Sequence, residues 1–71
     1  MEMVTEEYRG FVITYPRIPV DAARWIVNLS SNDSYLNVQL RGGKEVYTDH
    51  RSLEGAIEKA KARVDGILGP P

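Results

Sequence analysis

Residues 52–68 read SLEGAIEKAKARVDGIL and form the most regular segment of the chain. At 100° per residue, the apolar side chains of this segment fall within about a third of the helix circumference. They are Leu53, Ala56, Ile57, Ala60, Val64, Ile67 and Leu68. Asp49 or Ser52 can cap the start, and Gly69 is typical of a helix end. The pattern predicts one amphipathic helix over 52–68, followed by a tail at 69–71.

The residues before this helix predict strands. They are rich in β-branched and aromatic side chains, and apolar and polar positions alternate with the period of a half-buried strand. The expected strands are 8–15, 24–30, 35–41 and 44–48. We therefore expect an α+β fold, in which a four-stranded antiparallel meander sheet over 8–48 carries one C-terminal helix packed on one face.

Length and composition limit the domain organisation. At 71 residues the chain predicts a single domain over 1–71, with residues 1–7 as a flexible N-terminal segment. The absence of cysteine excludes disulfides and thiolate metal sites, so apolar packing and self-association are the expected sources of stability. No apolar run is long enough to span a membrane, and the acidic N-terminus does not look like a secretion signal. We expect a cytoplasmic protein without a membrane partner.

The strand pattern also predicts a register. A polar loop at 31–34 places Val27 opposite Val38 and Trp25 opposite Leu40, so that every inward residue meets an inward partner.

The glycine pair at 42–43 leaves two alternatives for the last hairpin. A two-residue turn pairs Val38 with Tyr47, which buries Tyr47 and leaves Val46 outside. A three-residue turn exposes Tyr47 instead. We favour the first, because burying an aromatic ring stabilises the fold more than burying a valine.

The same register predicts a binding surface on the outward face. It places Arg24 directly opposite Arg41, and like charges in that position repel. A partner that supplies an anion would relieve the repulsion, whereas the alternative is that both guanidinium groups extend into water. The predicted partner-binding residues are Arg24, Ile26, Tyr35, Gln39, Arg41 and Val46.

No motif in the chain indicates catalysis. His50 is the only histidine, and Asp49 and Ser52 beside it are expected to cap the helix rather than to form a triad. One histidine with scattered carboxylates does not predict a metal site, and no glycine belongs to a phosphate-binding loop. Asp65 in the last helical turn opposes the helix dipole, which Lys61 is expected to offset. The chain is therefore predicted to be no enzyme and to use no cofactor.

Four short motifs of the chain belong together: Tyr8-x-Gly10-Phe11-x-Ile13, Trp25-x-Val27, Tyr47-Thr48 and Ser52-x-Glu54-x-Ala56-Ile57-x-x-Ala60-x-x-x-Val64-Asp65. With these motifs the chain resembles a group of small bacterial and prophage proteins. The resemblance implies a β-meander followed by one helix, a mobile-element origin, and binding to a host protein. Residues 52–60 are also similar to the helix of HicB-type antitoxins, which neutralise a toxin and regulate their own promoter.

Two functions follow as hypotheses. The first is a non-enzymatic protein-binding module, a phage or prophage accessory protein that binds and inhibits a host protein through the outer sheet face or the connection at 16–23. Self-association through the outer sheet face or the sheet edge is compatible with this hypothesis and with the next. The second is a nucleic-acid-binding or antitoxin-like regulatory module that uses Arg24, Arg41 and Lys44.

Overall fold

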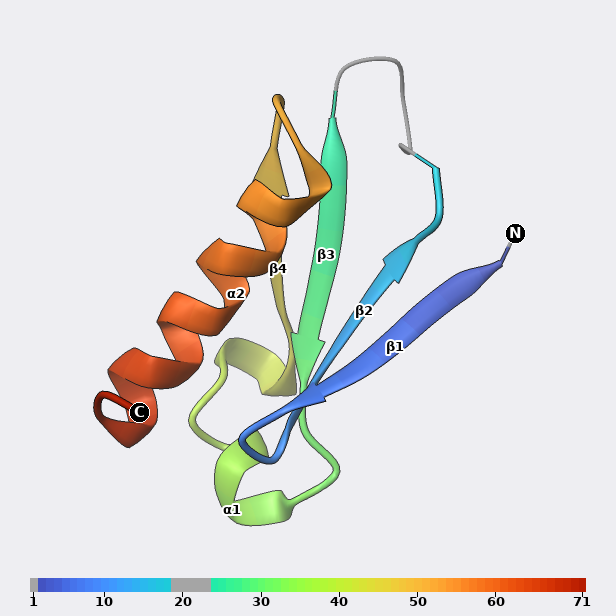
Figure 1. Ribbon diagram of the computed structural model, residues 1–71. Coiled ribbons are helices and arrows are strands. Elements are labelled where there is room, and N and C mark those ends of the chain that lie inside the picture. Colours follow the sequence, from blue (N-terminus) through green and yellow to red (C-terminus); the bar gives the residue numbers. More distant parts are fainter. Residues whose placement is uncertain (1, 19–23) are drawn as a thin grey trace.

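The computed structural model describes residues 2–18 and 24–71 of the chain. Its elements are β1 (Met3–Tyr8), β2 (Phe11–Pro16), β3 (Trp25–Ser30), α1 (Ser34–Asn37), the 3-10 turn η1 (Arg41–Gly43), β4 (Glu45–Asp49) and α2 (Leu53–Leu68) (Figure 1). The four strands form one antiparallel sheet in the order β1-β2-β3-β4, and α2 packs on one face of it. The predicted α+β meander with a C-terminal helix is confirmed.

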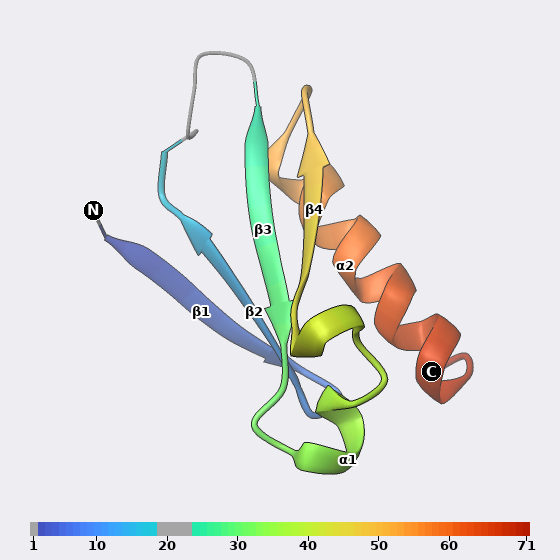
Figure 2. The same cartoon turned by 180° about the vertical axis from the view of Figure 1, so that it is seen from behind.

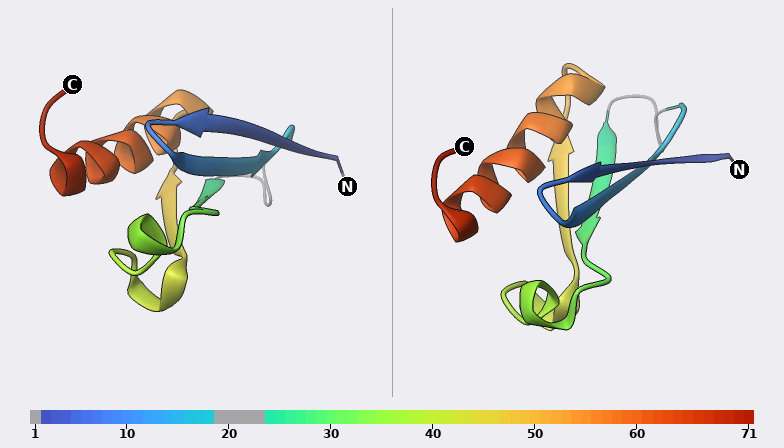
Figure 3. Two further views of the ribbon diagram at one scale, coloured as in Figure 1. Left: turned by 90° about the horizontal axis from the view of Figure 1, so that it is seen from below. Right: turned by 60° about the horizontal axis from the view of Figure 1, so that its bottom comes forward.

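Helix α2 matches its sequence pattern closely. The Ser52 side chain caps the start, where its Oγ accepts a hydrogen bond from the Gly55 backbone N–H at 3.0 Å. Ala56, Ala60 and Val64 are fully buried against the sheet, and the small alanines let the helix axis lie close to the strands. Figures 2 and 3 show the molecule from behind and from below. In these views no helix of the described chain lies over the face of the strands opposite α2.

The first hairpin differs from the prediction. Residues 1–7 were expected to be a flexible segment before the sheet, but residues 3–8 form the edge strand β1, which pairs along its length with β2. Arg9 and Gly10 make a two-residue turn, with φ angles of 52° and 90°. Positive φ at both positions matches the right-handed twist of the strands, so a single long run at 8–15 becomes a turn and a strand.

The connection between β3 and β4 also differs from the prediction. Residues 35–41 were expected to be a strand, and this is wrong: they contain α1 and the start of η1. The Asp33 side chain caps α1 by accepting hydrogen bonds from the backbone N–H groups of Tyr35 and Leu36. The Asn37 side chain then donates to the Ser31 carbonyl at 3.1 Å and to the Gly43 carbonyl at 2.8 Å. These local hydrogen bonds replace a strand ladder.

Because no strand intervenes, β3 pairs directly with β4. Val27 lies opposite Tyr47, so the predicted pairs of Val27 and Tyr47 with Val38 do not form, and Val38 is 73% exposed. Tyr47 nevertheless packs against the core and Val46 is 53% exposed, which is the orientation that the two-residue turn favoured.

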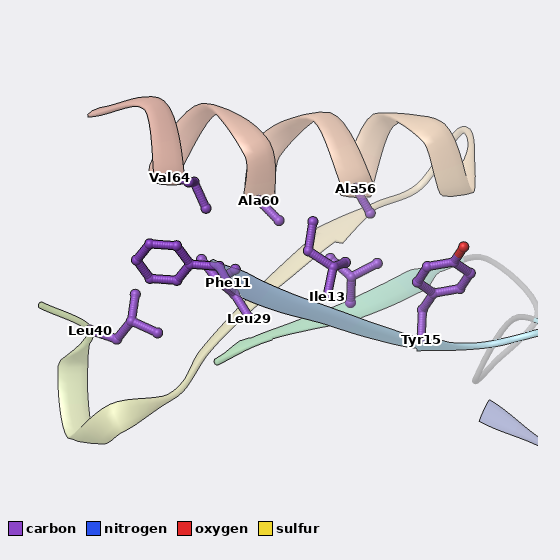
Figure 4. Packing of buried hydrophobic residues seen from close by; sticks show 9 residues of the cluster. Phe11, Ile13, Tyr15, Leu29, Leu40, Ala56, Ala60 and Val64 are labelled. Carbon is purple, nitrogen blue, oxygen red and sulfur yellow. The ribbon is translucent and has the colours of Figure 1, made fainter. Parts of the chain in front are cut away.

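The core lies between the sheet and α2 (Figure 4). Its buried residues are Phe11, Ile13, Tyr15, Val27, Leu29, Leu40, Ala56, Ala60 and Val64. Leu40 comes from the connection before β4 and packs at the end of the core, near the C-terminal half of α2.

Candidate functional site

One face of the sheet, the uncovered face, has no covering helix in the described chain, because α2 packs on the other face. Successive side chains of a strand point to opposite faces, and Phe11, Ile13, Val27 and Leu29 point to α2. The side chains of the uncovered face therefore include Met3, Thr5, Glu7, Val12, Thr14, Ile26, Asn28, Ser30, Val46 and Thr48. Among the strand residues of this face, Glu7 on the edge strand carries the only charge, although charged residues make up 27% of the chain.

Two of the predicted partner-binding residues lie on this face. Ile26 pairs with Thr48 and Val46 pairs with Asn28, which makes Ile26 and Val46 diagonal neighbours. The structure adds Met3, which is 46% exposed, and Val12 from the first hairpin. Met3 was missed because residues 1–7 were expected to be flexible. Val12 alternates with Phe11 and Ile13 in the predicted strand, but it was not among the predicted partner-binding residues. Each strand thus contributes one aliphatic side chain.

The predicted opposition of Arg24 and Arg41 is wrong. Arg24 directly precedes β3, whereas Arg41 lies in η1, just before Glu45, and Glu45 pairs with Leu29 near the far end of that strand. The two arginines are therefore at opposite ends of β3. Lys44 remains close to Arg41, but the three cations do not form the single phosphate-binding patch that the second hypothesis needs.

The other two predicted residues lie in the same connection as Arg41. Tyr35 is on α1 and is 84% exposed. Gln39 is exposed, and its backbone carbonyl accepts a hydrogen bond from Arg63 Nη2 at 3.2 Å. Neither side chain belongs to the strands of the uncovered face. The predicted connection at 16–23 lies largely outside the described residues.

An open hollow of about 480 Å³ lies at the β4 edge of the sheet. Its lining residues are Arg41, Lys44, Glu45, Val46, Tyr47 and Arg63. Three of them are cations and one is an acid. Within the described part of the chain, no carboxylate lies within ion-pair distance of the Arg41 or Lys44 side chains, whereas Arg63 is paired with Glu45. The hollow therefore carries a surplus of positive charge.

Glu45 is the centre of a hydrogen-bonded cluster beside this hollow. Its side chain is only 12% exposed, and it accepts hydrogen bonds from Arg63 Nε at 3.0 Å, from the Arg41 backbone N–H at 3.1 Å and from the Tyr47 hydroxyl. Burial raises the pKa of this carboxyl, but the donors from Arg63, Tyr47 and Arg41 outweigh it and lower the pKa to about 2. Burial and the bond to Glu45 raise the pKa of Tyr47 to about 12.

This cluster predicts an acid-sensitive contribution to stability. The folded pKa of Glu45 is below its unfolded value of 4.5, so the contribution is present above about pH 4.5 and is lost as the pH falls toward 2. The full shift corresponds to about 3 kcal/mol, which solvent screening at the open hollow reduces to about 1–2 kcal/mol. Glu45→Gln should lower the free energy of unfolding by that amount at pH 7 and by much less at pH 2.5. Urea unfolding at both pH values measures it, and an equal loss at both would contradict the assignment.

The residues around His50 cap the helix, as predicted. Asp49 Oδ1 accepts hydrogen bonds from the backbone N–H groups of Arg51 at 2.6 Å and Ser52 at 3.2 Å, and these two bonds lower the pKa of Asp49. Ser52 Oγ is engaged with Gly55. The Asp49 and Ser52 side chains are therefore both used at the start of α2.

A second cluster explains Asp65, which opposes the helix dipole. Its carboxylate accepts hydrogen bonds from the Tyr8 hydroxyl at 2.9 Å and from Arg9 Nη1 at 2.8 Å. The predicted partner Lys61 instead pairs with Glu6 at 3.8 Å and lies over the Tyr8 ring. These contacts tie β1 and its turn to the end of α2. They account for Tyr8 and Asp65 as structural residues.

Metal-binding clusters and membrane-spanning helices are both absent from the described residues. Residues 2–18 and 24–71 contain no group of three or more histidine, cysteine or acidic side chains placed to hold a metal ion. No helix in these residues has the length and hydropathy needed to cross a membrane. Comparison with protein-family models, with curated proteins and with solved structures found no significant match.

Proposed function

We propose that this chain is a non-enzymatic protein-binding module that docks a partner protein on the uncovered face of its sheet. The observation that supports this proposal most is that Glu7 carries the only charge among the strand residues of that face. Depletion of charged residues marks the centre of protein interfaces, whereas a face that only meets water has no reason to exclude them. The helix side of the molecule carries Glu54, Glu58, Lys59 and Lys61, as expected for a solvated surface.

The size of the face limits the kind of interface. Four strands of about six residues, spaced about 4.8 Å apart, cover roughly 400 Å². That is the size of the largest apolar patch on a typical monomer and about half of what each partner contributes to a standard interface. The contact must therefore extend beyond the strands. Val38 and Tyr35, which are 73% and 84% exposed in the connection before β4, offer apolar area for such an extension.

The resemblance to small prophage proteins supports a host protein as the partner, with inhibition by occlusion as the mode of action. Met3→Glu and Ile26→Glu each place a carboxylate on the uncovered face, and Ala62→Glu places the same group on an exposed position of α2. Tagged wild type and Ala62→Glu should capture the same host protein from lysate, and both face variants should lose it. Capture that survives both face substitutions would overturn the proposal.

A further inference from the structure

The backbone of β4 faces an open edge, and the register shows which groups are exposed there. The two-residue turn makes Tyr8 and Phe11 a hydrogen-bonded pair, and such pairs alternate along antiparallel strands. Following this alternation through the sheet makes Val27 and Tyr47 a hydrogen-bonded pair as well. The backbone N–H and C=O groups of Val46, one position along, therefore point away from β3.

A side-chain contact supports this orientation independently. The Lys59 ammonium donates a hydrogen bond to the Thr48 backbone carbonyl at 2.6 Å. Thr48 has the same orientation as Val46, so its carbonyl also points to the open edge, and Lys59 from α2 occupies it. No strand in the described chain pairs with this edge, because β4 is the last strand of the sheet. The Lys44 amide donates to the Arg41 carbonyl at 3.3 Å, so the open stretch runs from the carbonyl of Lys44 to the amide of Thr48.

The open stretch borders the hollow and its surplus of positive charge. Arg41 and Lys44 lie at one end without an ion-pair partner in the described residues, whereas Lys59 at the other end pairs with Asp49 at 3.6 Å. Arg63 between them is neutralised by Glu45. An extended chain laid along β4 would meet backbone donors and acceptors and, at the Arg41 and Lys44 end, two cations that no carboxylate of the described residues neutralises.

We infer that the β4 edge binds a short, extended, acidic peptide segment of a partner protein as a fifth strand. Strand addition draws its affinity from main-chain hydrogen bonds and its specificity from side chains on alternate positions. Acidic side chains would pair with Arg41 and Lys44, and an aliphatic side chain on the uncovered face would pack beside Val46. Lys59 limits the added strand to about four or five residues, given its position at Thr48. This inference goes beyond the proposed function, because it concerns the strand edge and not the sheet face.

Charged side chains at a sheet edge also serve to prevent pairing with other strands. If Arg41 and Lys44 recruit a partner, an acidic peptide should bind at the β4 edge. If they only prevent strand pairing, it should not bind there. The test is an NMR titration of isotope-labelled wild type with acetyl-Glu-Thr-Val-Thr-Glu-amide and with acetyl-Lys-Thr-Val-Thr-Lys-amide. In each peptide the charged ends and the central valine lie on the same face of an extended strand, as do Lys44, which directly precedes β4, and Val46. The acidic peptide should shift the amide resonances of Val46 and Thr48, and the lysine peptide should bind at least about tenfold more weakly. No shift with the acidic peptide, or equal binding of both, would overturn the inference and leave edge protection as the role of the cations.

A charge-reversed variant provides the matched control. Arg41→Glu combined with Lys44→Glu should bind the lysine peptide more tightly than the acidic one. Both side chains are exposed, and Arg41 contributes only its backbone N–H to the Glu45 cluster, so the fold should persist. If that variant does not fold, Arg41→Gln with Lys44→Gln should still weaken the acidic peptide about tenfold. Unchanged peptide preference in a folded variant would overturn the inference.

The peptide assay separates this inference from the proposed function. Met3→Glu lies on β1, at the other edge of the sheet, and should leave peptide binding at β4 unchanged. Peptide binding without capture of a host protein would reject the proposed function and retain the strand addition. Capture that depends on Met3 and Ile26, with no peptide binding, would retain the proposed function and reject the strand addition.

Discussion

Leu40→Ala is expected to lower the free energy of unfolding by about 2–4 kcal/mol, whereas Val38→Ala should change it by less than about 0.5 kcal/mol. Leu40 is 4% exposed and belongs to the buried cluster of Phe11 and Leu29 (Figure 4). Truncating it removes apolar contacts and leaves a cavity that the short connection before β4 cannot easily fill. Val38, two residues earlier, is 73% exposed, so truncating it removes little buried apolar area.

Urea unfolding of both variants measures the difference. For a domain whose total stability is expected near 5 kcal/mol, the Leu40 effect is a large fraction and should be visible as a strong drop in the midpoint. The pair also distinguishes the observed connection from a strand over 35–41, in which Val38 and Leu40 would both face the core. Similar losses in the two variants would support that strand and contradict the structure.

Gly55→Ala is expected to destabilise the protein by about 1–2 kcal/mol, although alanine normally favours a helix over glycine by about 1 kcal/mol. A Cβ atom at Gly55 would lie 2.5 Å from Asp49 Oδ2 and 2.7 Å from its Cγ. Asp49 would have to move, and its bonds to the Arg51 and Ser52 backbone N–H groups would be lost or weakened. These capping bonds outweigh the gain in helix propensity.

Gly66→Ala is the matched control for this effect. Gly66 is in the same helix and is exposed, and a Cβ atom added there would meet no other atom within 4 Å. The substitution should therefore stabilise the protein by about 0.5–1 kcal/mol. Thermal or urea unfolding should thus show opposite signs for the two glycines, and a gain at both would mean that Asp49 does not hold the helix start.

The first hairpin shows where sequence patterns stop being sufficient. Residues 8–15 are rich in strand-forming side chains, and Gly10 was the one local signal of a turn, because glycine is disfavoured inside strands and adopts positive φ freely. The turn is stabilised by contacts far along the chain, because Tyr8 and Arg9 both bond to Asp65. The sequence marked Asp65 as unusual but could not supply its partners, which lie 57 and 56 residues away.

The residues of the candidate sites also divide into those that a local pattern predicts and those that only the tertiary structure brings together. Ile26 follows from the period-2 alternation of its own strand, which is a local property. The outward orientation of Val46 depended instead on the choice between two turns at 42–43. The hollow at the β4 edge joins Arg41 and Lys44 to Arg63 of α2, and no spacing rule connects these residues. The aspartate cap at Asp33 was a local signal that could have replaced the predicted strand by a helical turn, since aspartate is favoured at helix starts.

Local patterns were enough to establish helix α2, its buried stripe and the α+β class, and to limit its cap to Asp49 or Ser52, because periodicity and capping depend on neighbours within a few residues. Long-range contacts were needed to establish that β3 pairs with β4, that Arg24 and Arg41 lie at opposite ends of β3, and that β4 has an open basic edge. Strand partners are chosen by the burial of the whole sheet against the helix and by hydrogen bonds between distant segments. Those free energies are not encoded in any single stretch of the chain.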